Sequence, residues 1–362
     1  LTYEIATLNA GTITAASTTK EKNNLASLLF RINYAYAGKY LLSVASRWDG
    51  SSRFGANKKW GYFPSFSAGW NVHKENFMAT SRLFSELKIR GSYGATGNNN
   101  IGNYRSLASA VPVAAILGNN ITSGFDVTSY SNPELSWERT FSSNIGFDAG
   151  LLRNKIRLTI DYYNATTDKL LLFLPIPSVT GYDGYWTNRG KVTNRGLEYE
   201  LSVRILDKKD FTWNITTVGT TLKNKLIDFG GSDKIISIGD DKRPNYFLTQ
   251  VGSPLVQFYG YQYDSVVSIR GSNYWPIGVQ AERVFAIDQN KDGVVDNNDR
   301  VVLGTPYPDF TWGLTNEFTF KNFDLRFLLQ GSHGGQVLNI DPNYYETQFA
   351  STGVNAYLAY TP

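Results

Sequence analysis

The sequence has 362 residues, of which 35 are basic and 31 acidic, for a net charge of +4. This balance does not favour nucleic acid as a partner, and without cysteine there is no disulfide or thiolate-metal chemistry. The 23 Tyr, 21 Phe, 8 Trp and 33 Gly residues are typical of an all-β secreted or outer-membrane protein, and no long apolar run indicates a transmembrane helix.

Alternation of apolar and polar residues begins in the stretch LLFRINYAYAGKYLLSVASRW. Side chains that alternate with a period of two point to opposite faces of a strand, so this pattern predicts a hairpin with one apolar face. Its turn is expected at residues 37–39. The apolar face consists of Phe30, Ile32, Tyr34 and Tyr36 before the turn, and of Tyr40, Leu42 and Val44 after it.

The segment HKENFMATSRLFSEL, which begins at His73, does not have the pattern of a tight turn. Its apolar residues Phe77, Leu83, Phe84 and Leu87 have helical spacing. We therefore expect a small periplasmic helix over residues 73–85.

Further hairpins follow along the chain. In the stretch GLEYELSVRILDKKDFTWNITT, residues 196–217, apolar side chains alternate with Glu198, Glu200 and Arg204. Each hairpin therefore has one apolar and one polar face. The apolar series are Ile145, Phe147, Ala149, Ile156, Leu158, Ile160 and Tyr162; Leu197, Tyr199, Leu201, Val203, Ile205, Phe211, Trp213 and Ile215; and Trp312, Leu314, Phe318, Phe320, Phe323, Leu325, Phe327 and Leu329.

Strand length and loop length together predict an all-β fold, a transmembrane antiparallel β-barrel. The pattern gives about eleven strands of about 9–12 residues, which suits a tilted bilayer span, whereas soluble strands are nearer 5–6 residues. Such barrels have short periplasmic turns and long extracellular loops. The apolar face is then expected to contact lipid, and the charged face to line a wide, water-filled lumen. The short turns are at 37–39, 150–154, 207–210 and 321–322, and the long connections at 49–60, 95–136, 165–194 and 223–307.

Tryptophans near the strand ends favour the same interpretation. Trp48, Trp137 and Trp312 lie at the long-loop end, and Trp70 and Trp213 at the short-turn end. Membrane barrels carry an aromatic girdle at each lipid interface, so we expect these residues to belong to two girdles.

A series of longer motifs occurs in one order along the chain. Through these motifs and their order, the sequence resembles the C-terminal part of SusC/RagA-type TonB-dependent outer-membrane transporters. The resemblance covers nearly the whole chain. The motifs are LLSVASRWDGSSRFG (41–55), WGYFPSFSAGWNV (60–72), LKIRGSYGATGNNNIGNY (87–104), NPELSWERTFSSNIGFD (132–148), NRGLEYELS (194–202) and DQNKDGVVDNNDRVVLGTPYPDFTWGLTNEF (288–318).

The resemblance implies a 22-stranded barrel closed by an N-terminal plug. It also implies import of oligosaccharides or peptides across the cell outer membrane, with energy supplied through TonB and a SusD-like surface lipoprotein as a lid. Residues 1–362 would form part of the barrel, and residues 223–307 a long extracellular loop region. Because the chain begins at Leu1 and ends at Pro362, we expect the plug, the TonB-contacting segment, the first barrel strands and the final strands to lie outside it.

The segment DQNKDGVVDNND, residues 288–299, has the spacing of an EF-hand-type calcium loop. Oxygen ligands at alternate positions wrap one cation, and Gly293 allows the sharp turn. Position 12 is an aspartate where a glutamate is usual, and no helix pair is evident. An ordinary Asp/Asn turn explains the segment equally well. The candidate ligands of a structural calcium are Asp288, Asn290, Asp292, the Val294 carbonyl, Asp296 and Asp299.

Aromatic side chains in the long loops are candidates for substrate contact. Sugar rings stack on aromatic rings while neighbouring polar groups bond their hydroxyls. Packing of the loops themselves explains the same residues equally well. The candidates are Tyr182, Tyr185 and Trp186 in one loop, and Tyr274 and Trp275 in another.

Two other function classes are weighed against import. A carbohydrate-binding or adhesive β-rich surface module would have shorter strands and long loops at both ends. A glycan hydrolase would need two facing carboxylates in unequal environments, whereas Glu198 and Glu200 are better explained as lumen charges. His73 and His333 lie far apart without partners, which argues against a metal site or a catalytic triad. No nucleophile–base pairing stands out either, so we expect no catalytic residue and no required cofactor.

Overall fold

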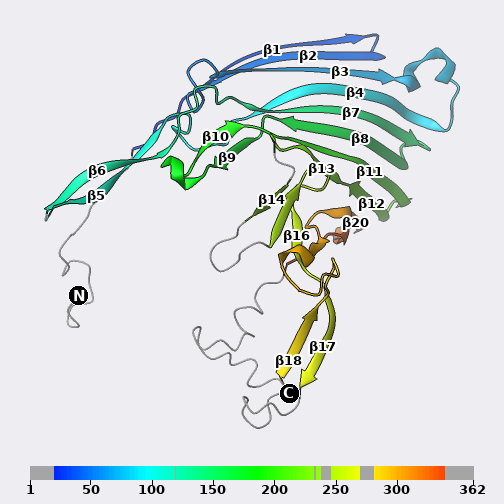
Figure 1. Ribbon diagram of the computed structural model, residues 1–362. Coiled ribbons are helices and arrows are strands. Elements are labelled where there is room, and N and C mark those ends of the chain that lie inside the picture. The colour runs from blue at the N-terminus through cyan, green and yellow to red at the C-terminus, as the bar shows by residue number, and fades with distance from the viewer. Residues whose placement is uncertain (1–19, 119, 232–233, 238–245, 270–280, 339–362) are drawn as a thin grey trace, which may run out of the picture.

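The computed structural model describes residues 20–118, 120–231, 234–237, 246–269 and 281–338. Its main element is an 11-stranded antiparallel sheet that curves into a wall (Figure 1), with β1 and β21 at its edges. The all-β prediction is confirmed. In sheet order the wall consists of β1 (Leu25–Tyr36), β2 (Tyr40–Ser51), β3 (Trp60–Asn71), β4 (Phe84–Asn98), β7 (Glu138–Leu151), β8 (Ile156–Asp168), β11 (Lys191–Lys208), β12 (Phe211–Thr221), β20 (Pro308–Phe320) and β21 (Phe323–Gly334), with β13 (Lys223–Asp228) paired to β11 beyond the end of β12.

The register confirms that the long wall strands have an apolar and a polar face. Ile32 pairs with Val44, and Tyr162 pairs with Leu197, so apolar side chains meet across neighbouring strands. On the other face, Arg90 lies beside Gly146, and Glu198 pairs with Asp161. Because strand side chains alternate, this register places the apolar residues together on one side of the wall.

Tight turns join the wall strands at one end, the short-turn end. Ala37 and Gly38 adopt left-handed backbone conformations between β1 and β2. Between β7 and β8, residues 152–154 all have positive φ, and Ser85 anchors this turn by accepting the N–H of Asn154 at 2.9 Å. The hairpin turns therefore lie where the sequence predicts them.

The predicted helix at residues 73–85 is wrong. The chain makes two 3₁₀ turns there, η2 (Val72–Lys74) and η3 (Asn76–Met78), and then enters β4 at Phe84. Leu87 pairs with Ala149 of β7. The sheet therefore uses the backbone hydrogen bonds that a helix would need, and Phe77 is left exposed.

Glu75 ties this connection to the neighbouring turn. Its carboxylate accepts hydrogen bonds from Lys39 Nζ at 2.9 Å, Tyr40 Oη at 2.8 Å and Trp70 Nε1 at 3.1 Å. These donors, Lys39 first, lower the pKa of Glu75 to about 2. The carboxylate therefore stays ionised, and the contact is kept, until the pH falls through that value.

The other end of the wall carries long connections that fold into small sheets. One projects from the wall through the hairpin of β5 and β6 (Figure 1). Within the described residues, no helix is long and apolar enough to cross a membrane. The connection elements are β5 (Ser109–Leu117), β6 (Asn120–Ser129), β9 (Leu171–Pro175), η4 (Ser178–Thr180) and β10 (Gly184–Asn188); and β14 (Lys234–Ser237), β15 (Phe247–Gln250), β16 (Gln257–Tyr261), β17 (Tyr263–Ile269), β18 (Ala281–Ala286), η5 (Asn297–Asp299) and β19 (Arg300–Gly304).

Candidate functional site

The polar face of the wall carries a charge cluster built from three strands. Arg90 of β4 donates from Nε to Asp148 of β7 at 3.0 Å, and from Nη2 to Asp161 of β8. Thr159 donates to Oδ1 of Asp148 at 3.2 Å, and the same oxygen also accepts from Nη2 of Arg90 at 3.3 Å. One guanidinium thus joins two carboxylates on neighbouring strands. Because both partners are charged, these are charge-assisted hydrogen bonds.

Gly146 makes room for this cluster. A Cβ at this position would lie 2.5 Å from Oδ1 of Asp161 and 2.6 Å from Cζ of Arg90. These separations are too short for non-bonded atoms, so a larger residue would displace the guanidinium. The glycine is therefore required by close side-chain approach, and its own backbone conformation is ordinary.

Beside the cluster lies an open groove of about 860 Å³ on the same face. Asp161, Glu198 and Glu200 line it together with Thr220 and Gln330. Within the described part of the chain, Glu198 and Glu200 have no ion-pair partner. Unpaired carboxylates are stable only in contact with water, so this face suits a hydrated lumen.

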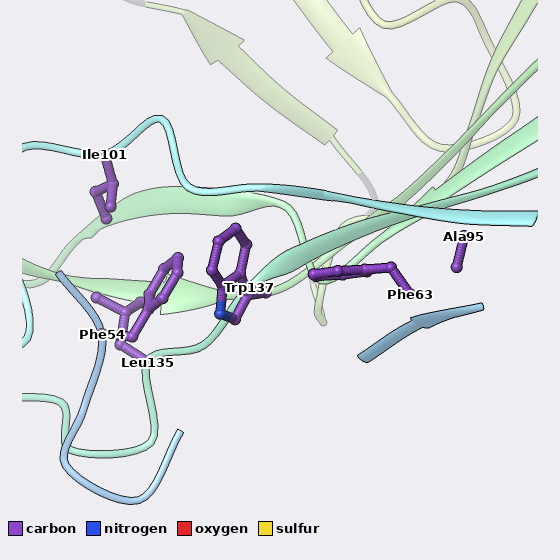
Figure 2. Close-up of a cluster of buried hydrophobic side chains, with 6 residues drawn as sticks. All are labelled: Phe54, Phe63, Ala95, Ile101, Leu135 and Trp137. Carbon is purple, nitrogen blue, oxygen red and sulfur yellow. The ribbon is translucent and has the colours of Figure 1, made fainter. Parts of the chain in front are cut away.

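The long connections are held together by a cluster of buried apolar side chains, which we call the loop cluster. Figure 2 shows the Trp137 ring between Phe54 and Phe63, with ring centroids 5.1 Å and 5.4 Å away. The indole Nε1 of Trp137 donates to the Lys59 carbonyl at 2.8 Å. Its burial means that the prediction of Trp137 as a lipid-girdle residue is wrong. The loop cluster consists of Phe54, Phe63, Ala95, Ile101, Leu135 and Trp137.

Two predicted substrate residues lie near one pocket of about 500 Å³, which we call the tyrosine pocket. Tyr185 lines it directly, beside Tyr130 and Thr187. Tyr182 packs on Tyr130 with ring centroids 4.2 Å apart, and this phenol raises the pKa of Tyr182. The structure thus brings Tyr182 and Tyr185 to one site and adds Tyr130, which lies more than fifty residues earlier.

The other predicted aromatic residues are not part of this pocket. Trp186 follows Tyr185 on β10 and points to the opposite face of that strand. There it packs against the loop cluster and Phe173, and the Arg105 guanidinium lies 5.7 Å from its ring. Tyr274 and Trp275 lie outside the described residues.

The calcium-loop segment is closed by hydrogen bonds between its own side chains and backbone. Asp288 accepts the N–H groups of Lys291 at 2.6 Å and Gly293 at 2.8 Å. Asp299 is fully buried and accepts N–H groups of Asp296 at 2.7 Å and Gln289 at 2.8 Å. These bonds, the one from Asp296 first, lower the pKa of Asp299. Asp299, which the spacing assigns to position 12, thus uses its carboxylate to close the loop through hydrogen bonds to the backbone of the same segment.

Among the described residues, no group of three or more His, Cys, Asp or Glu side chains is arranged to hold a metal ion. The candidate calcium ligands therefore stay a prediction. If calcium binds, adding it to metal-free protein should slow amide hydrogen exchange in residues 288–299, and Asp288→Asn should remove the effect. If hydrogen exchange is unchanged at millimolar calcium, the segment is an ordinary Asp/Asn turn and not a calcium site.

Sequence patterns alone do not predict the charge cluster. Arg90, Asp148 and Asp161 lie on different strands and form no local motif. Each occupies a polar-face position of its own strand, and that alternation is the signal available in the sequence. Their meeting depends on how β4, β7 and β8 are aligned.

Comparison with known proteins agrees with this architecture. Residues 2–362 match the family model described as TonB dependent receptor-like, beta-barrel. The chain is 35% identical over 347 residues to TonB-dependent receptor P3 of Formosa agariphila, covering 92% of this chain and 34% of the relative. It is 34% identical over 331 residues to TonB-dependent receptor SusC of Bacteroides thetaiotaomicron, covering 87% of this chain and 32% of the relative. The chain therefore spans about a third of the length of these relatives.

Solved structures show the same fold. The RagAB peptide importer in its open-open state matches with a TM-score of 0.77 at 23% identity, over 95% of this chain and 37% of the importer chain. Its closed-closed state matches with a TM-score of 0.74 over 89% of this chain and 35% of that chain. The two-faced wall, the family match and the relatives agree: the chain belongs to the TonB-dependent receptor β-barrel family, as a SusC/RagA-type outer-membrane β-barrel protein.

Proposed function

We propose that the full protein imports oligosaccharides or peptides across the outer membrane, driven through TonB. The observation that carries this proposal is the two-faced wall. Its apolar face suits lipid, and its polar face carries the charge cluster and a groove of about 860 Å³ that suits a hydrated passage. The names of the relatives, TonB-dependent receptor P3 and SusC, support the same function.

The partner in this proposal is a SusD-like surface lipoprotein that covers the extracellular mouth. The long connections lie at one end of the wall and are stiffened by the loop cluster, so they offer a shaped surface to a lid. The relative named SusC and the fold match to the RagAB peptide importer support this choice of partner. Coupling to TonB is assigned to the segments of the full protein that lie outside this chain.

Substrate contact is proposed at the tyrosine pocket. Tyr130 and Tyr185 contribute aromatic rings to the lining, and Ser131 and Thr187 line the pocket beside them. Rings with adjacent hydrogen-bonding groups suit sugars and the side chains of peptides. Much of the other polar lining is already used, since Asn188 bonds Ser136 through both ends of its amide.

Uptake and co-purification test the proposal on the full-length protein. Cells should lose uptake of labelled oligosaccharides or peptides when the gene is deleted, and mild-detergent extraction should recover a near-stoichiometric lipoprotein. Tyr185→Ala should weaken uptake about tenfold, from loss of one stacking contact, whereas Val179→Ala, on the same connection and exposed, should not. Glycan binding with no uptake would instead indicate a surface adhesion module, and hydrolysis of the substrate would indicate an enzyme.

A further inference from the structure

The apolar face of the wall ends abruptly on β8 and β11, toward the long connections. Tyr162 and Leu197 are directly paired and exposed, and they are the last apolar pair on that side. The next pair on the same face is Asn164 with Arg195. On the other side of β11, at the same level, Lys223 of β13 pairs with Arg195. A polar and cationic surface thus replaces the lipid-facing one within a single step of the register.

This change occurs at the level where lipid headgroups are expected. From Ile205 to Arg195, β11 advances about 33 Å at about 3.3 Å per residue, or about 25 Å along the membrane normal for a tilt of about 40°. The apolar band of outer-membrane barrels is about 25 Å tall. Arg195 therefore lies at the upper border of that band, on the side of the long extracellular loops.

The cationic side chains surround a pocket of about 500 Å³, which we call the cationic pocket. Arg195, Lys223 and Lys225 line it, and Asp309 contributes the opposing charge. In the part of the chain that the structure describes, none of these three cations has an ion-pair partner. By contrast, Arg139 at the same end of the wall pairs with Asp168 at 3.1 Å. Three cations against one carboxylate leave an excess of positive charge on the outward side.

Asn164, which lines the same pocket, places a second requirement on the ligand. Its Oδ1 is buried and has no hydrogen-bond partner. A buried acceptor without a partner is costly, so this oxygen favours a ligand that brings a hydroxyl or amide donor. A fully ionised phosphate group has no donor for this oxygen, whereas a phosphorylated sugar offers the anion and, beside it, sugar hydroxyl groups.

Aromatic side chains lie in the cationic pocket and below it. Tyr199 and Phe310 stack on the apolar face with ring centroids 6.5 Å apart. Tyr307, a further pocket residue, has its pKa raised by burial, so its phenol stays neutral. An apolar surface under a cationic rim matches an amphipathic ligand whose chains point toward the membrane centre.

We propose that Arg195, Lys223, Lys225 and Asn164 form an outward-facing site for the phosphorylated sugar headgroup of an outer-leaflet glycolipid. The cations bind the phosphate, Asn164 accepts a sugar hydroxyl, and the acyl chains lie against Tyr199 and Phe310. The site rests on the outer-membrane placement of the family and is independent of what the protein transports. It anchors the wall at the border between lipid and the extracellular loops.

The test uses full-length protein in mild detergent and a bisphosphorylated lipid A as the probe. Combining Arg195→Gln, Lys223→Gln and Lys225→Gln should weaken lipid A binding about 100-fold, from about fivefold per cation near an anionic lipid surface. The matched control combines Lys155→Gln, Lys208→Gln and Lys209→Gln at the short-turn end, where these exposed lysines carry the same total charge. This control should bind lipid A like the unmodified protein.

Two further probes and one partner measurement keep the proposal open to refutation. Dephosphorylated lipid A should bind as weakly as the triple variant does, and inorganic phosphate at 10 mM, about a hundredfold above the lipid, should compete poorly. Equal binding of lipid A by the triple variant would overturn the proposal, as would tight binding of phosphate alone. Loss of a co-purifying lipoprotein without loss of lipid would show a protein docking surface instead. Heat-modified migration in gels verifies that each variant is folded.

Discussion

Replacing Arg90 with methionine should destabilise the wall by about 2–3 kcal/mol, because Asp148 and Asp161 would then face each other without a cation. Removing one partner of a fully buried ion pair costs about 3–5 kcal/mol. The Arg90 side chain is 32% exposed, and water reduces the expected loss. The measurement is the free energy of unfolding in urea and detergent, followed by loss of the folded band in gels.

The matched control is Arg326→Met on the same polar face. Arg326 pairs with Glu317 at 3.1 Å, but these side chains are 72% and 45% exposed. An exposed ion pair contributes about 0–1 kcal/mol, so this variant should be close to neutral. If both variants lost the same stability, the charge cluster would have no special structural role.

A second pair of variants separates the charge of the cluster from its geometry. Gly146→Ala should destabilise the wall in the same direction, because its Cβ would displace the Arg90 guanidinium. Gly91→Ala places its Cβ 3.9 Å from the nearest atom, a backbone oxygen of Asn144. This variant should therefore cost nothing, and equal losses would contradict the close-packing argument.

Replacing Leu135 with alanine should loosen the long connections by about 2–4 kcal/mol while the wall stays folded. Leu135 is fully buried in the loop cluster, so the substitution leaves a cavity. Hydrogen exchange should speed up in residues 52–59, 99–118 and 120–137, and the unfolding midpoint of the wall should hardly change. Under the proposed function, binding of the surface lipoprotein should weaken as well.

Leu107→Ala is the control, because Leu107 is 57% exposed in the same connection. Gly55→Ala tests the same unit from the backbone. A Cβ there would lie 1.7 Å from the Pro133 carbonyl oxygen, and the Gly55 N–H donates to Leu135 at 2.9 Å. Normal protection in both Leu135→Ala and Gly55→Ala would show that the loop cluster does not stiffen the connections.

The segment 73–87 shows why periodicity can mislead. Phe77, Leu83, Phe84 and Leu87 have helical spacing, but Leu87 pairs with Ala149 across the sheet. Backbone pairing with β7 uses the hydrogen bonds that a helix would need. The spacing is a local property, and the neighbouring strand that overrides it lies about sixty residues away.

The aromatic residues after Tyr182 show a different limit. Tyr185 and Trp186 are adjacent in sequence, yet the strand β10 turns them to opposite faces. Tyr185 lines a pocket with Tyr130, whereas Trp186 packs on the loop cluster. Composition identifies the loop, but the pairing of β10 with β9 decides which ring is available.

By itself, the sequence determined the wall: its strands, its tight turns, and which face of each strand is apolar. These features follow from the alternation of apolar and polar side chains along each strand. That alternation is visible in a local stretch of sequence, without reference to the rest of the chain. Only the tertiary structure decided where Arg90, Asp148 and Asp161 meet, why Trp137 is buried, and where Arg195 and Lys223 form a pocket. Those outcomes depend on register between strands that are distant in sequence, and register is set by the whole sheet.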